Sequence, residues 1–201
     1  MCIRDSLTRG LAGEVLTEMA ELTESGCVGF SQADVALTST QAAALSSSQI
    51  GALSSAQAAA IETADFAAIS TLSLRSMTTA ALSALTTDQI QSLTTAQAAA
   101  LTSSQVAALG SDQIAALQTA DLAALTSVAL AAIGTAGIEA LTTEQMPALT
   151  LAQIGALGTA AIAALETEDL AAMTTAQFAR LSAAQLQALT TDLSLIHISE
   201  P

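Results

Sequence analysis

A strict eight-residue repeat limits what this chain can fold into. From Leu37 the sequence falls into units of eight without a gap, with nineteen full units to Ala188 and a twentieth starting at Leu189. We number the positions of each unit from 1 to 8, with Leu37 at position 1. Position 1 is Leu, Ile or Met in every unit, and position 6 is a large apolar residue in sixteen of the nineteen. Position 3 is Ser or Thr in seventeen units, and position 5 is Gln in eleven and Asp in three. Because one unit cannot bury its own apolar residues, the units must pack on one another.

The repeat predicts one short helix per unit. A single continuous helix would leave successive units about 80° out of phase, so the apolar residues would spiral around it. Thr or Ser at position 2 with Gln at position 5 has the spacing of a capping box, and positions 1 and 6 then have the spacing of a hydrophobic staple. A cap at position 3 is the alternative, which Pro147 at position 7 favours because it would then lie nearer the helix start. Helices of about six residues are too short to stand alone, so we expect an all-α solenoid that buries positions 1 and 6.

Two further features leave alternatives open. A β-solenoid would also suit short repeats with Thr and a Leu/Ile ladder, although Ala and Gln are poor strand formers and Val is scarce. Gly110, Gly134 and Gly158 all stand at position 2, three units apart. This spacing indicates either three units per superhelical turn or a coincidence.

Charge narrows the possible partners. The net charge is −14, there is no Lys, and the four arginines (Arg4, Arg9, Arg75 and Arg180) form no cluster. Binding to nucleic acid or to an anionic membrane surface needs clustered cations, so we expect neither. A membrane-spanning helix needs about 18 or more successive apolar residues, and the sequence contains no such stretch. We interpret the acidic surplus as a source of solubility and Arg75 and Arg180 as solvated.

The sequence offers no arrangement typical of an enzyme. The single histidine is His197, so the many Ser and Thr residues lack the usual base that would activate them. Cys27 stands at position 6 of LTESGCVG, where a small apolar side chain is expected. Zinc sites need several Cys or His ligands. We therefore expect no catalytic residues, no cofactor and no metal site.

Paired carboxylates are the strongest candidates for a polar site. Glu62 with Asp65, and Glu166 with Asp169, have the i,i+3 spacing that would place each pair on one side of a helix, with Glu168 beside the second pair. Such pairs can bind calcium or do acid–base chemistry. We favour the simpler interpretation, in which they complement the positive end of the helix dipole.

The two ends differ from the rest. MCIRDS at residues 1–6 and SLIHISEP at 194–201 resemble peptides translated from sequencing-adapter DNA, which recur at the ends of reading frames taken from metagenomic reads. We therefore divide the chain into adapter-derived ends at 1–6 and 194–201, an amphipathic helix or degenerate repeats at 7–28, and the solenoid at 29–193. On this interpretation the protein is a fragment of something longer.

The run LTTAQAAALTSSQVAALGSDQIAAL at 93–117 resembles Ala/Thr/Gln-rich repeat tracts of large bacterial adhesin- or haemagglutinin-like surface proteins. That resemblance extends over most of the chain and is specific for the style of repeat. It implies a non-catalytic spacer or stalk, at the cell surface or outside the cell, whose partners are the neighbouring repeats of the same longer chain. The alternatives are a solenoid that binds another protein and, more remotely, an array of Thr side chains that binds ice or a surface.

Overall fold

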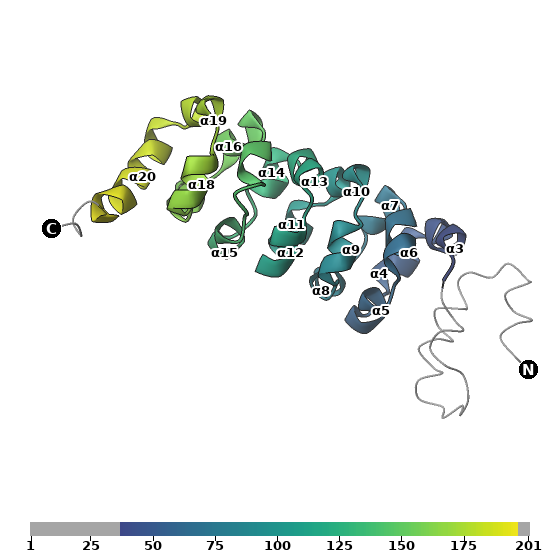
Figure 1. Ribbon diagram of the computed structural model, residues 1–201. Helices are drawn as coiled ribbons and strands as arrows, with labels where there is room; N and C mark the ends of the chain where they lie inside the picture. The colour runs from purple at the N-terminus through teal and green to yellow at the C-terminus, as the bar shows by residue number, and fades with distance from the viewer. Residues whose placement is uncertain (1–36, 197–201) are drawn as a thin grey trace, which may run out of the picture.

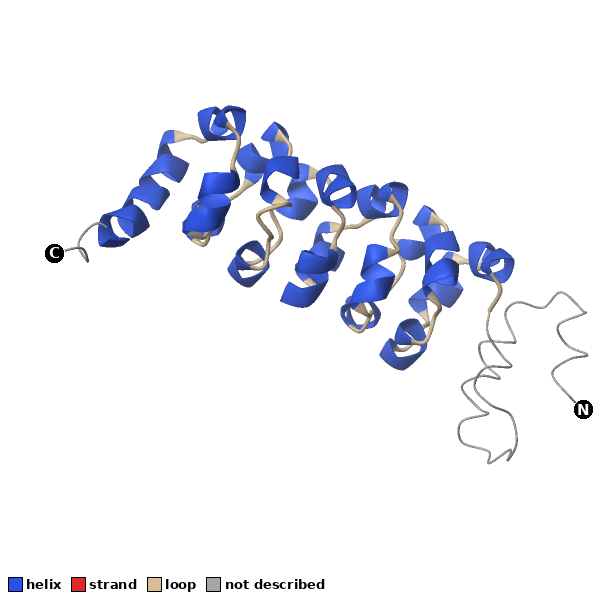
Figure 2. Cartoon of the chain, in the orientation of Figure 1, coloured by secondary structure: helices blue, strands red, loops and turns tan. Residues whose placement is uncertain are grey.

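The computed structural model describes residues 37–196, and within them an elongated stack of short helices (Figure 1). This part holds eighteen α-helices and one 3₁₀-helix, η2, and no strand (Figure 2). The expected all-α solenoid is therefore confirmed, and the β-solenoid alternative is wrong. The helices are α3 Ser39–Ala44, α4 Ser47–Gly51, α5 Ser55–Ala59, α6 Thr63–Ala68, α7 Thr71–Leu74, α8 Thr79–Ser83, α9 Thr87–Gln91, α10 Thr95–Ala100, α11 Ser103–Ala107, α12 Ser111–Ala116, α13 Thr119–Ala124, α14 Ser127–Leu130, α15 Thr135–Glu139, η2 Met146–Ala148, α16 Leu151–Ala156, α17 Thr159–Ala163, α18 Thr167–Ala172, α19 Thr175–Arg180 and α20 Ala183–Ile196.

The α-helices from α3 to α19 begin after an N-cap residue at position 2, and most of these residues cap the helix through a side-chain hydroxyl. In the unit of α10, Thr94 has an extended backbone (φ −84°, ψ 152°), and its side chain accepts a hydrogen bond from the Gln97 N–H. Gln97 Oε1 accepts in return from the Thr94 N–H at 2.8 Å, which completes a capping box. Leu101 is also extended (φ −61°, ψ 136°) and ends the helix. Positions 1 and 2 thus redirect the chain between helices, and the alternative cap at position 3 is wrong.

Three units make one turn of the solenoid. Every helix from α3 to α17 packs on the helix three units further along, as in α3 on α6, α4 on α7 and α5 on α8. One turn therefore contains 24 residues, and the spacing of Gly110, Gly134 and Gly158 equals one turn. The core is continuous and consists mainly of positions 1 and 6, represented by Ile90 and Leu93 with 0% and 5% of their surface exposed.

Two units depart from the expected short α-helix. Pro147 lacks the N–H that would bond to the turn before it, and its unit forms only the 3₁₀-helix η2, although Thr142 and Gln145 still pair at 2.9 Å. The last helix, α20, has 14 residues and does not end at Leu189. Its second unit has Leu193 at position 5 in place of Gln. The expected length of about six residues is thus confirmed for α3–α19 and wrong for α20.

Part of the expected domain organisation lies outside the described residues. Segments 1–6 and 7–28, the first eight residues of the expected solenoid and residues 197–201 are not described, and 194–196 form the end of α20. Among the described helices, none is both long and apolar enough to cross a bilayer.

Candidate functional site

The most specialised polar groups of the fold are the position-5 glutamines, which connect successive turns. Gln97 accepts the Thr94 N–H through Oε1, as described above, and its Nε2 donates to the previous turn. The acceptors are the carbonyl oxygens of Phe66 at 3.0 Å, Ala67 at 3.2 Å and Ile69 at 2.8 Å. The first two lie in the last part of helix α6, where carbonyls lack i+4 partners within the helix, and the Phe66 carbonyl also accepts the Ile69 N–H at 3.2 Å. One side chain therefore caps its own helix and satisfies the end of another.

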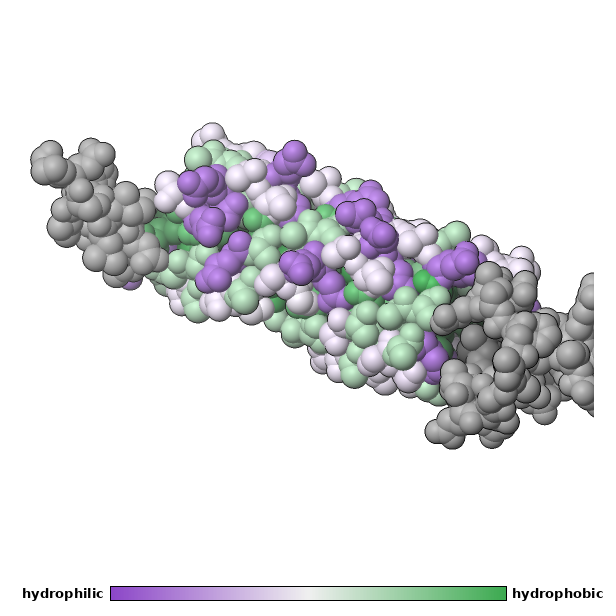
Figure 3. Space-filling view, turned by 60° about the horizontal axis from the view of Figure 1, so that its bottom comes forward, coloured by the Kyte–Doolittle hydropathy of each residue, from purple (hydrophilic) through white to green (hydrophobic). Residues whose placement is uncertain are grey.

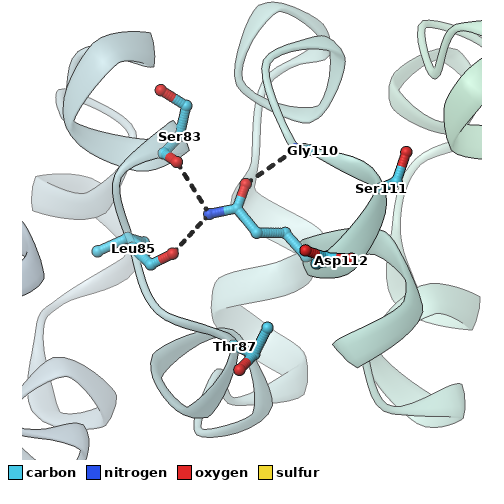
Figure 4. A pocket seen from close by; sticks show the side chains of 7 residues that line it. Ser83, Leu85, Thr87, Gly110, Ser111 and Asp112 are labelled. Atoms are coloured by element: carbon cyan, nitrogen blue, oxygen red, sulfur yellow. Dashed lines mark hydrogen bonds between the residues drawn. The ribbon is translucent and has the colours of Figure 1, made fainter.

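The same arrangement recurs in every Gln-containing unit from the seventh onward. We call these residues clamps. Each donates through Nε2 to a carbonyl 31 residues earlier and to another 28 residues earlier, as Gln89 does to Ala58 and Ile61. The eight clamps are Gln89, Gln97, Gln105, Gln113, Gln145, Gln153, Gln177 and Gln185. All are at most 6% exposed. Figure 4 shows the Gln113 amide between the Gly110 N–H and the carbonyls of Ser83 and Leu85.

The first three units provide an internal comparison. Gln41, Gln49 and Gln57 form the same capping boxes as the clamps. Their side chains are only partly buried, and within residues 37–196 no carbonyl accepts from their Nε2 atoms. The residues 31 and 28 positions earlier, which a clamp would contact, lie outside the described part of the chain, so these three units show the capping box alone. Sequence reasoning identified capping alone, because the partners of a clamp depend on the number of units per turn.

Aspartate replaces the clamp in three units. Asp65 and Asp121 accept hydrogen bonds of 2.8 Å from Ser39 Oγ and Thr95 Oγ1, which belong to the preceding turn. Gln118, three residues before Asp121, donates to the Gln91 carbonyl at 2.6 Å. In this unit an acceptor at position 5 and a donor at position 2 together connect the turns.

The predicted carboxylate pairs do not form shared sites. Glu62 and Glu166 are exposed N-cap residues whose side chains make no cap hydrogen bond. Their partners Asp65 and Asp169 are buried, with 4% and 3% of their surface exposed. Within the described part, no three Asp, Glu, His or Cys side chains are grouped as a metal site would need.

Asp169 is the one carboxyl with a distinctive environment. Burial raises its pKa above the usual range of aspartate, and the negative charges of Glu166 and Glu168 raise it further. A hydrogen bond with the backbone of Glu166 opposes this shift. Glu166 and Glu168 thus act as a source of repulsion for Asp169.

The remaining surface carries small polar groups. A shallow hollow is lined by Ser83, Leu85, Thr87 and residues 110–113, where Gly110 presents no side chain (Figure 4). Position-2 hydroxyls are occupied in caps, whereas most position-3 Ser and Thr residues are exposed in each turn. On the face shown in Figure 3, hydrophilic side chains lie in separate patches among weakly apolar ones.

The other residues considered from the sequence are isolated or undescribed. Arg75 and Arg180 are both exposed, and the Arg180 guanidinium lies so close to Gly155 that a Cβ there would stand 3.1 Å from Nε. Leu72 and Val128 are the most exposed large apolar residues, at 72% and 70%, and both occupy position 4 of their units. Cys27 and His197 lie outside the described residues.

Comparison with known proteins places these features in a family. The ALTTAQ repeat family matches residues 58–95, 91–119, 114–151 and 162–193, which together make up more than half of the chain. No curated protein and no solved structure matches the sequence. The matched segments contain seven of the eight clamps, all but Gln153, and the three position-5 aspartates. The chain therefore belongs to the ALTTAQ repeat family and is a structural repeat segment.

Proposed function

We propose that this segment is a non-catalytic spacer within a larger bacterial surface or secreted protein, and that its length is its functional property. The observation that carries the proposal is the uniform packing of each unit on the third unit after it. Such a solenoid lengthens by one turn for every three units added, without a new kind of contact.

The described surface supports a spacer more than a binding module. Interfaces usually depend on clustered aromatic or Arg anchors, whereas the outward positions 2, 3 and 4 carry mainly Thr, Ser and Ala. Leu72 and Val128 stand alone on different helices, α7 and α14. In the described part the clusters of polar groups serve caps and clamps, so their chemistry is accounted for by the fold.

Small-angle X-ray scattering of lengthened chains tests the spacer role. A variant in which residues 93–116 are duplicated contains one additional turn, and we expect a longer maximum dimension with unchanged helical signal per residue. The matched control inserts 24 Gly and Ser residues at the same point, which should add a flexible loop without new helix. An unchanged maximum dimension in the duplication variant would contradict the proposal.

The proposal that this segment belongs to a larger protein is tested by the sequence of the flanking gene. Long-read sequencing of the locus should show the repeat continuing into a longer frame with a secretion signal and further domains. A gene that encodes residues 1–201 alone would instead favour a free-standing solenoid with a binding role.

A further inference from the structure

The clamps are unevenly distributed along the solenoid. Units that contain a clamp make up residues 85–116, 141–156 and 173–188. Between and before them lie three runs of units without Gln at position 5, at 61–84, 117–140 and 157–172. We call these the Gln-free runs. At position 5 they carry Asp65, Ser73, Ala81, Asp121, Ala129, Gly137, Ala161 and Asp169.

Fewer side-chain hydrogen bonds connect the Gln-free runs to the preceding turn. A clamp makes two or three such bonds, as Gln105 and Gln97 do. In the first run Ser73 makes one, from Oγ to the Leu45 carbonyl at 2.7 Å, Asp65 accepts one, and the Ala80 carbonyl accepts one from Ser55 Oγ at 2.9 Å. Within the described part, Ala129 and Ala161 have no side-chain group that could make any.

In the second run, other side chains replace only some of the hydrogen bonds that clamps would make to the preceding turn. Asp121 accepts from Thr95, Gln118 donates to the Gln91 carbonyl, and Ser111 Oγ donates to the Ala136 carbonyl at 3.2 Å. This run lies between clamped units on both sides, so its weakness does not arise from the end of the chain. A Gln at position 137 is also obstructed, because a Cβ on Gly137 would stand 2.3 Å from Ile133 Cγ2.

We propose that the Gln-free runs are built-in weak seams at which the solenoid opens first, so that it yields in blocks. In a repeat protein whose units contact mainly their neighbours, stability is a sum of local terms, and the weakest interfaces open at the lowest cost. Opening of one 24-residue run releases a chain with a contour length of about 80 Å. The biological use of the seams rests on the proposed spacer function. A spacer under tension would extend stepwise while the clamped units stay folded.

Hydrogen exchange of the full chain, followed by mass spectrometry, tests the seams directly. Backbone amides of 117–140 should exchange about tenfold faster, or more, than those of 85–116, because none of the three interfaces of this run with the preceding turn contains a clamp. Both segments are internal, so fraying of the ends does not affect the comparison. Equal exchange in the two segments, or faster exchange in 85–116, would overturn the proposal.

Variants separate clamping from capping. The triple variant Gln97→Ala, Gln105→Ala and Gln113→Ala should make 93–116 exchange as fast as 117–140. The matched control, Thr94→Ala and Thr102→Ala, removes cap hydroxyls from two of the same units and leaves the clamp amides in place, so exchange in 93–116 should rise less than in the triple variant. The same effect from both variants would contradict the proposal.

If the Gln97, Gln105 and Gln113 variant fails to fold, the relative exchange rates of 117–140 and 85–116 in the unmodified chain still test the proposal. Exchange reports opening whether or not the solenoid acts as a spacer. A failure of the length-scaling experiment would therefore leave a positive exchange result intact, and the reverse also holds.

Discussion

At the scale of single residues, one amide side chain carries two separable contributions to stability. Gln97 caps α10 and donates to three carbonyls of the preceding turn, whereas the Thr94 hydroxyl serves the cap of the same helix. We expect Gln97→Ala to lower the free energy of unfolding by about 2–4 kcal/mol, because buried hydrogen bonds are worth about 1 kcal/mol each and their loss leaves carbonyls poorly satisfied. Thr94→Ala should cost about 1 kcal/mol, the value of a cap. Urea unfolding of both variants measures the difference, and equal losses would show that the clamp adds nothing.

Asp169 gives the solenoid a pH dependence of known sign. Its pKa is raised in the folded state, chiefly by burial, so folding favours the protonated carboxyl. The stability it contributes is therefore present below the normal aspartate pKa and is lost as pH rises through the raised value. We expect Asp169→Asn to raise the melting temperature at pH 7, with the difference from the unmodified chain shrinking toward about pH 4.

The matched control for this effect is Asp121→Asn. Asp121 is equally buried, but its carboxylate accepts a hydrogen bond from the Thr95 hydroxyl. The control should therefore gain no stability at pH 7. If the melting temperatures of the two variants depend on pH in the same way across this range, the role assigned to Asp169 is wrong.

At the scale of the helix, the sequence predicted most of what the structure contains. Thr94 and Gln97 have the spacing of a capping box, and both partners of that box lie within one unit, so local reasoning sufficed. The burial of Ile90 and Leu93 followed from the same register. Pro147 was used to favour a cap at position 3, whereas the structure keeps the position-2 pairing of Thr142 with Gln145 and has a short 3₁₀-helix in this unit.

Features that depend on the third dimension were not predictable from one unit. The sequence left open the number of units per turn, so it could not show which carbonyls lie beside Gln97 Nε2. For the same reason the sequence, which favoured a helix-dipole role for Glu166 and Asp169, could not show that one is exposed and the other buried.

At the scale of the whole molecule, stacking places like charges in register. Asp88 and Asp112 both occupy position 4 on α9 and α12, which pack together, and both are exposed. With a net charge of −14, repulsion between turns opposes the compact form. Salt shortens the range of this repulsion from about 30 Å at 0.01 M to about 8 Å at 0.15 M.

We therefore expect the melting temperature to rise by roughly 2–4 °C between these two salt concentrations. The double variant Asp88→Asn and Asp112→Asn should melt higher at low salt and respond less to added salt, because the stacked pair has lost its charge. Glu139→Gln and Glu62→Gln together remove the same net charge from two exposed sites on helices that are not packed on each other, and serve as the control. If both double variants reduce the salt response equally, the repulsion comes from net charge alone, and the stacking of Asp88 on Asp112 has no special effect.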